Sequence, residues 1–477
     1  MLIWFVIIYL LIAIGIGLYA ATKVHNARDY VVAGRSLPLY MVTATVFATW
    51  FGSETVLGTS TTFLQEGLHG IVADPFGASL CLILVGLFFA RKLYRMNLLT
   101  IGDYYRLRYG RTVETLTGMA IVISYLGWVS AQITAIGLVF SLVSQGQITP
   151  HNGMLIGSSI VLVYTLFGGM WSIALHDFLQ MNIILAGMLY IAWVVSGDVG
   201  GVMNVVRHAD AAGKFNFWPK LTAPDVLAFF GAWITMMLGS IPQQDVFQRI
   251  MSAKNETVAM QGSVLGGSLY FLFAFIPIFL AYSATLIDPN MVHRLLDVDP
   301  QHILPELILH HTPIFAQIMF FGALLSSILS TASATLLAPS ITFTENVIKP
   351  FIGDWGERHL LLVMRIVVVI FAGLVALYAL NSNGSIFNMV ENAYKVTLVA
   401  AFVPLACGLY WSRATNQGAL LAILAGTGSW LWLETYHPDG VWPPQLFGLL
   451  MSITGMVIGS LLPDVVSGRK RETWRNE

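Results

Sequence analysis

The sequence predicts an all-α polytopic membrane protein of about 13 transmembrane helices in a single transmembrane domain, 1–477. Composition is the first reason, since 56% of its 477 residues are hydrophobic, 10% are charged and the mean hydropathy is +0.74. The second is a series of apolar runs long enough to span a bilayer, about 20 residues each. The third is a pair of polar interruptions inside these runs, which are tolerated where the backbone lines a cavity within the protein.

Charge and cysteine content exclude several other classes. The net charge of −1 leaves nothing to attract a polyanion, so we expect a lipid bilayer and not nucleic acid as the large-scale partner. Cys81 and Cys407 both lie in apolar segments and are interpreted as small hydrophobic residues rather than as a disulfide or a metal pair.

Thirteen apolar runs can be counted. They begin near residues 2, 38, 68, 113, 152, 171, 225, 258, 313, 359, 385, 415 and 444. The run over 2–21 lacks the basic start of a secretory signal, so we expect it to be the first transmembrane helix. Only Gly168 and Gly169 separate the fifth and sixth runs, so a count of twelve stays open.

The distribution of basic residues predicts the orientation. If the 13 spans alternate, loops on one side carry 19 of the 24 Lys and Arg residues, and loops on the other side carry four. Cytoplasmic loops are the basic ones. We therefore expect a multi-pass plasma-membrane protein (inner membrane in a bacterium), with the N-terminus outside and the C-terminus in the cytoplasm.

The first interrupted span is the stretch 43–62. It holds Gly52, Ser53 and Glu54 near its middle, and clustered hydroxyls follow them. A carboxylate at membrane depth marks a functional site by default. We interpret this span as a broken helix that lines a binding site.

The second interruption comes at 239–245, where Pro242 precedes Gln243 and Gln244. Interrupted spans in corresponding places of two halves indicate an inverted-repeat transporter with its site near the midplane. The alternative is an ordinary proline kink followed by a helix end.

Serine and threonine residues crowd the span 322–344. Ser327, Ser330 and Thr331 fall at i, i+3 and i+4, which places three oxygen-bearing residues on one helix face. Neutral oxygen ligands suit sodium better than a transition metal. The alternative is a helix interface, where small residues allow close packing.

Acidic residues inside the spans complete the pattern. Asp177 stands alone in the sixth span, where it is either functional or a cap at the cytoplasmic end. Glu391 and Lys395 are spaced i, i+4 in the eleventh span and are expected to pair.

Four short motifs together resemble the sodium:solute symporter family, which includes sodium-coupled proline, sugar, sialic acid and choline transporters. They are GRSL at 34–37, GGMWSIALHDFLQ at 168–180, FQR at 247–249 and SILSTASATLL from Ser327. The resemblance implies a LeuT-like core of five plus five helices in inverted repeat. The implied parts are an extra helix and inner loop at 1–36, repeats at 37–196 and 225–411, and two extra helices with a basic tail at 412–477.

The resemblance also implies a sodium site, with sodium as the only metal. Its implied ligands are the carbonyls of Ala48, Phe51 and Ser327 and the hydroxyls of Ser330 and Thr331. Asp177 and Ser333 match residues that in some members hold a second ion, but Ala334 lacks a ligand atom, so Asp177 is expected to assist ion release instead.

For the solute, the candidate residues face the cavity that the two breaks would form. They are Trp50, Ser53, Glu54, Gln132, Gln243 and Gln244. We expect sodium-coupled import of a small polar organic solute, with an amino acid or related zwitterion favoured. The alternatives are a choline, betaine or sugar symporter, or a membrane sensor acting with a separate signalling partner. Other partner proteins are not predicted, and an enzyme is not expected because no metal-ligand motif or nucleophile and base pair is recognisable within the spans.

Overall fold

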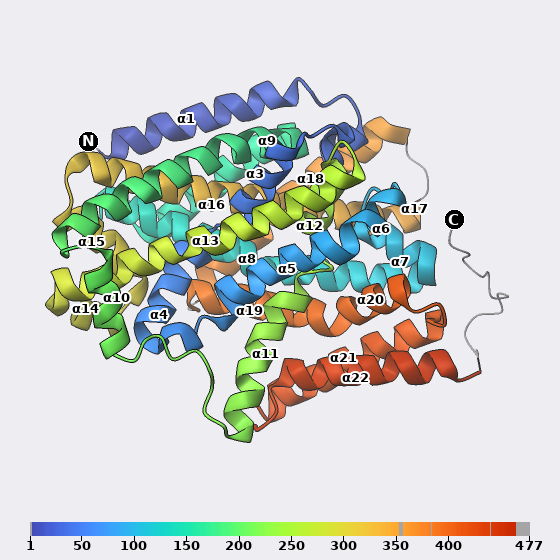
Figure 1. The fold of residues 1–477 in the computed structure, drawn as a ribbon. Helices are drawn as coiled ribbons and strands as arrows, with labels where there is room; N and C mark the ends of the chain where they lie inside the picture. Colours follow the sequence, from blue (N-terminus) through green and yellow to red (C-terminus); the bar gives the residue numbers. More distant parts are fainter. Residues whose placement is uncertain (1, 353–355, 383, 439, 464–477) are drawn as a thin grey trace.

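A computed structural model describes residues 2–352, 356–382, 384–438 and 440–463 (Figure 1). Within these residues the fold is helical, and its single β-bridge joins Leu37 to Ala253. Most of the long helices lie roughly along one axis, with α1 on one edge of the bundle and the pair α21 and α22 on another (Figure 1).

The chain first forms α1 and a short α2, and then the helices up to residue 211. Their bounds are α1 Leu2–Ala21, α2 Ala27–Val32, α3 Leu39–Trp50, η2 Glu54–Thr59, α4 Ser60–Glu66, η4 Val72–Gly77, α5 Ala78–Leu84, η5 Val85–Phe89, α6 Ala90–Arg95, α7 Ile101–Tyr109, α8 Arg111–Val143, α9 Pro150–Asp198 and α10 Val202–Ala211.

The second part of the chain repeats the alternation of long and broken helices. Its bounds are α11 Ala223–Gly239, α12 Gln244–Ser252, α13 Glu256–Ile287, α14 Pro289–Leu296, α15 Ile303–His311, α16 Ile314–Thr342, η7 Phe343–Ile348, α17 Lys349–Ile352, α18 Gly356–Asn381, α19 Ile386–Thr397, η8 Leu398–Phe402, α20 Val403–Tyr410, α21 Asn416–Tyr436 and α22 Pro444–Leu461.

Nine helices in the described ranges are long and apolar enough to span a membrane, or ten if the bent pair α11 and α12 counts as one span. The predicted count of 13 is therefore not confirmed. One reason is that α3, with 12 residues, ends where the second predicted span is broken. Another is that α9 contains both the fifth and the sixth predicted spans. The division into repeats at 37–196 and 225–411 stays a prediction.

The glycine pair predicted to form a turn interrupts α9. Gly169 leaves the helical conformation, with φ 51° and ψ −142°. A side chain there would lie 2.5 Å from the ring and the carbonyl of Tyr30, so only glycine fits. A straight helix of 49 residues would be about 74 Å long. Because this is more than twice the thickness of the hydrocarbon core, the break divides α9 into two segments of membrane length.

Both predicted helix interruptions are present. The first lies between α3 and η2, where Phe51 has a ψ of 70°. The second lies between α11 and α12, whose axes differ by 43°. Polar backbone and side-chain groups at these breaks are buried inside the bundle, as membrane depth requires.

Burial separates the central helix α16 from the peripheral helix α1. Every residue from Gly322 to Thr342 is buried, including its serines and threonines. Helix α1 exposes large apolar side chains such as Trp4, at 67%, as expected for a lipid-facing helix. The serine-rich stretch is therefore at the centre of the protein and not at its lipid surface.

The basic residues predict the location of the C-terminus. Arg249 is 1% exposed within α12 and is no loop residue, which removes one of the 19 residues on the basic side but preserves the imbalance. The basic tail from residue 464 lies outside the described residues. A reporter fused to the C-terminus is expected to be active in the cytoplasm, and one inserted in the loop 212–222 is expected to be active outside. The reverse pattern for both fusions would contradict the orientation.

Candidate functional site

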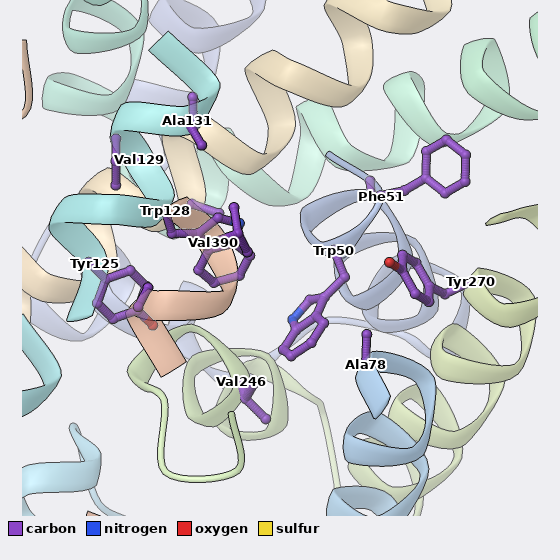
Figure 2. Packing of buried hydrophobic residues seen from close by; sticks show 14 of the residues in the cluster. Trp50, Phe51, Ala78, Tyr125, Trp128, Val129, Ala131, Val246, Tyr270 and Val390 are labelled. Atoms are coloured by element: carbon purple, nitrogen blue, oxygen red, sulfur yellow. The ribbon is translucent and has the colours of Figure 1, made fainter. Parts of the chain in front are cut away.

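Four aromatic rings meet next to the break that follows α3. Trp50 ends that helix, Tyr125 and Trp128 come from α8, and Tyr394 comes from α19. The ring of Trp50 stacks on Tyr394 with centroids 6.1 Å apart and meets Trp128 edge-on at 5.7 Å. Trp128 also stacks on Tyr125, at 5.9 Å. All four side chains are fully buried. Figure 2 shows Trp50 facing the α8 residues on one side and Tyr270 of α13 on the other.

Two carboxylates hold these rings. Asp245, at the start of α12, accepts hydrogen bonds from the Trp50 indole at 3.2 Å and from the Tyr125 hydroxyl. Glu54, beyond the break, accepts a bond of 3.0 Å from the Trp128 indole. Because the ring donors of Trp50, Tyr125 and Trp128 are each bound to a carboxylate, these three rings are fixed in orientation. We call the four rings with Asp245 and Glu54 the aromatic cage.

Two hydroxyls near the cage have no hydrogen-bond partner among the described residues. They are the Tyr394 hydroxyl and the Ser53 side chain, and both are buried. An unsatisfied buried polar group costs about 1–3 kcal/mol. Such groups are expected where a bound molecule supplies the missing partner.

A cavity of about 440 Å³ lies beside the same broken helix. It is bounded by α4, α11 and α19, and it reaches Gly58, about one turn from Glu54. Its lining carries Glu66 and Glu391 and contains neither lysine nor arginine. The cavity therefore favours positively charged molecules.

The serine-rich helix contacts the other face of the break. The Thr331 hydroxyl donates to the Thr49 carbonyl at 2.8 Å, and the Ser330 hydroxyl donates to Asp177 at 2.5 Å. Ala48 and Phe51 are the predicted carbonyl donors of this segment. Ala48 precedes Thr49 on the last turn of α3, and Phe51 is the residue that follows the end of this helix. Hydroxyls, carbonyls and a carboxylate thus meet at one point, a donor set that suits a hard cation.

Gly52 lies where the aromatic cage meets the predicted sodium site. A side chain at this position would lie 2.4 Å from a carboxylate oxygen of Glu54 and 2.7 Å from the Thr331 hydroxyl. The absence of a side chain allows the cage carboxylate and the serine-rich helix to approach the same backbone.

Asp177 and Arg249 approach the break from the same side. The Thr49 hydroxyl is 3.4 Å from Asp177 and accepts a bond of 2.5 Å from the Arg249 guanidinium. Arg249 also donates to the backbone carbonyl of Asp245, at 2.7 Å. The guanidinium therefore lies between the predicted ion site and the cage.

The three glutamines predicted to contact the solute differ in their relation to the aromatic cage. Gln132 donates to Glu54 at 2.7 Å and accepts from the Ser53 amide at 3.0 Å, so it belongs to the cage wall. Gln243 bonds to Ser124 and Thr397. Gln244 points away and accepts from the Ile101 amide at 2.9 Å, because it opens α12 on the face toward α7.

On the serine-rich helix, the Ser327 and Ser333 hydroxyls donate to carbonyls of their own helix, those of Leu324 and Ser330. The role of the Ser327 carbonyl as a sodium ligand therefore stays a prediction. The expected pairing of Lys395 with Glu391 is wrong: Lys395 lies 3.5 Å from Glu434 on α21 instead.

The sequence interpretation missed most of the cage. Tyr125, Trp128 and Gln132 lie at i, i+3 and i+7 of one helix, so they share a face, and this spacing was the available signal. Tyr394 and Asp245 carry no such signal, because their role depends on contacts between distant helices.

Comparison with known proteins places the chain among transporters. The model of the "Sodium:solute symporter family" matches residues 30–426. The human "High affinity choline transporter 1" is 26% identical over 468 residues, covering 92% of this chain and 80% of that protein. The "Osmoregulated proline transporter OpuE" of Bacillus subtilis is 25% identical over 482 residues, covering 95% and 93%.

A solved structure shows the same fold. It is that of a Na+-coupled sialic acid symporter in a substrate-bound outward-open state, with a TM-score of 0.81, 18% identity and coverage of 96% of this chain and 97% of that one. The similarity confirms the predicted fold class, an all-α polytopic membrane protein with a LeuT-like core.

Gly52→Ala is expected to disrupt the site, because the added methyl group must displace Glu54 or Thr331. Overpacking of this kind costs about 1–3 kcal/mol. Thermal unfolding of the purified protein should show a midpoint several degrees lower. Gly15→Ala is the matched control, since a side chain at Gly15 meets nothing within 4 Å. Equal midpoints for the two variants would contradict the close approach at Gly52.

Proposed function

Because the chain belongs to the sodium:solute symporter family, we propose that it is a sodium-coupled symporter importing a small solute with a positively charged ammonium group. The observation that carries this proposal is the aromatic cage. Four buried rings and the carboxylates of Glu54 and Asp245 meet beside the break in the helix that begins at Leu39.

Each part of the cage suits a cation. Aromatic faces attract ammonium groups by about 0.5–2 kcal/mol per ring, with tryptophan the strongest. Glu54 is 2% exposed, and its described hydrogen bonds come from the neutral side chains of Trp128 and Gln132. A buried carboxylate without a basic partner is costly in a membrane. A bound cation would neutralise it.

The acidic cavity beside the cage supports the same solute class. Glu66 and Glu391 line it, and its lining contains neither lysine nor arginine. The nearby Lys395 lies 3.5 Å from Glu434. A cation would be concentrated in this cavity relative to a neutral sugar. The sugar alternative therefore has less support from the geometry.

A zwitterion such as an amino acid or a betaine is the second candidate. Its ammonium group fits the rings, and the unpartnered hydroxyls of Tyr394 and Ser53 are available to donate to its carboxylate. The same hydroxyls equally suit the alcohol of an amino alcohol such as choline. The two solute types differ in net charge, and transport measurements distinguish them.

The position of the predicted site at Ser330 and Thr331 supports sodium coupling. A sodium ion held by Ser330 and Thr331 of α16 and by carbonyls at the end of α3 would fix the broken helix against the serine-rich helix. Trp50 lies on that same end of α3. Binding of the ion would therefore order the cage, and the coupling must act equally in both directions.

Uptake into proteoliposomes tests the function. We expect a sodium gradient to drive uptake of choline or glycine betaine, and proline or glucose to be taken up more slowly. Trp128→Ala should raise the half-saturating solute concentration by about 3- to 30-fold, the value of one cation–π contact, and Trp128→Phe should raise it less.

Trp193→Phe is the control, because this tryptophan is 73% exposed on α9. Sodium-driven uptake of glucose alone, with no effect of Trp128→Ala on affinity, would reject the ammonium solute. Uptake that ignores the sodium gradient would reject the symporter.

The sodium site makes a separate prediction. Ser330→Ala and Thr331→Val should raise the sodium concentration for half-maximal uptake, and solute affinity at fixed sodium should fall by about 1–3 kcal/mol. Ser326→Ala is the control on the same helix, since Ser326 bonds Tyr9 of α1 at 2.6 Å and faces away from the break. Equal effects of all three substitutions would show that the hydroxyls only pack.

A further inference from the structure

A second polar cluster lies on the side of Trp50 that faces α13 (Figure 2). Its centre is Asp74, 1% exposed, where the backbone of η4 becomes extended with φ −133° and ψ 122°. The Asp74 carboxylate accepts hydrogen bonds from the hydroxyls of Thr59 at 2.8 Å, Thr55 at 3.4 Å and Tyr270.

A backbone carbonyl adds a fifth oxygen-bearing group. The Trp50 carbonyl, at the end of α3, is 3.4 Å from the Thr55 hydroxyl. That hydroxyl is in turn 2.8 Å from the Tyr270 hydroxyl. Oxygen atoms from the helix break, from η2, from η4 and from α13 therefore surround one buried region.

Charge distinguishes this cluster from an ordinary hydrogen-bond network. The sites around the break contain the buried carboxylates of Glu54, Asp74, Asp177 and Asp245, whereas Arg249 is the one buried Lys or Arg among the described residues. Arg249 contacts the Asp245 backbone and the Thr49 hydroxyl that borders Asp177. The hydrogen-bond partners described for Asp74 are all neutral hydroxyls, which solvate a charge but do not balance it.

We propose that Asp74, Thr55, Thr59, Tyr270 and the Trp50 carbonyl form a binding site for a second sodium ion. This site is separate from the one at Ser330 and Thr331, which lies on the α16 side of the break and would use other ligands. The two sites would therefore share no ligand.

The ligand chemistry suits a hard monovalent cation, as sodium is. All the ligands are oxygen, which excludes a preference for soft metals. One carboxylate among neutral oxygens balances a single positive charge, whereas calcium sites commonly combine several carboxylates. A proton on Asp74 would balance the same charge, and the experiment separates the two cations.

The cluster has a direct route to the solute, which rests on the proposed function. Trp50 places its ring in the aromatic cage and its carbonyl in the Asp74 cluster. An ion bound to the carbonyl would fix the ring that faces the solute. The second ion would thus strengthen solute binding through the same residue.

Counting bound sodium tests the site without any solute. Binding of radioactive sodium to the purified protein should saturate at two ions per chain. Asp74→Asn, which keeps the shape of the side chain but removes its charge and one acceptor oxygen, should reduce this to one. Ser79→Ala should retain two, because Ser79 is on the same segment but bonds the Pro75 carbonyl instead.

The outcomes separate this site from the proposed function. One ion in the parent protein, lost in Ser330→Ala but kept in Asp74→Asn, would overturn the second site and leave symport intact. No bound sodium in the parent would reject sodium coupling as a whole. If Asp74→Asn left the number of bound sodium ions unchanged but abolished the pH dependence of uptake, the carboxylate would bind a proton instead, and the sodium site would be overturned. If Asp74→Asn reduced the bound sodium from two ions to one and no ammonium compound was transported, the second sodium site would be supported and only the proposed solute class would be rejected.

Tyr270→Phe provides a second variant if Asp74→Asn fails to fold. It removes one ligand oxygen and keeps the ring that packs against Phe51. The dissociation constant of one of the two ions should rise by about 3- to 10-fold, as for the loss of one interaction of hydrogen-bond strength. Unchanged affinities for both ions would overturn the proposal.

Discussion

The break between Trp50 and Glu54 is the constraint on which the rest of the site depends. Gly52 has space for no side chain, because Glu54 and Thr331 both approach its backbone. The helix ends at this point, and the polar groups on either side of the break point in different directions. The Thr49 carbonyl faces the serine-rich helix, the Trp50 indole faces Asp245, and Glu54 faces Trp128. Unwound backbone inside a membrane protein is stable only when such internal partners satisfy it.

The second broken helix stabilises the first. Asp245 opens α12 directly after the 43° bend. Its carboxylate accepts a hydrogen bond from the Trp50 indole, and its backbone amide donates one to the Tyr125 hydroxyl at 2.9 Å. One turn later, Arg249 reaches back to the Thr49 hydroxyl. The two breaks therefore share their polar partners, and a movement of one helix against the other must change the contacts of both. This is the structural basis expected for a site at the junction of two moving bodies.

The sequence indicated the breaks, the buried carboxylate Glu54 and the serine-rich face, because each is a local departure from an apolar helical pattern. Ser330 and Thr331 could be chosen by their spacing alone, and the structure places both at the break. Only the residues that α8 contributes to the cage could be predicted in this way, from their spacing. Tyr394 of the cage and Asp74 of the second polar cluster lie in segments without such a signal, and only the packing of distant helices brings them to Trp50. The prediction for Gln244 failed for the same reason, since its side chain meets Ile101 instead of the cavity.

Electrostatics links the proposed cations to one another. The four carboxylates around the break face a single buried guanidinium, so the ionised core carries about three uncompensated negative charges in a medium that penalises each of them. A sodium ion beside Asp177, an ammonium solute beside Glu54 and a second sodium ion beside Asp74 would balance this excess. Each cation would lower the cost of closing water out of the core while the others are bound. Cooperative loading would then follow from charge balance, and the loaded protein would be the one that closes most readily around its solute.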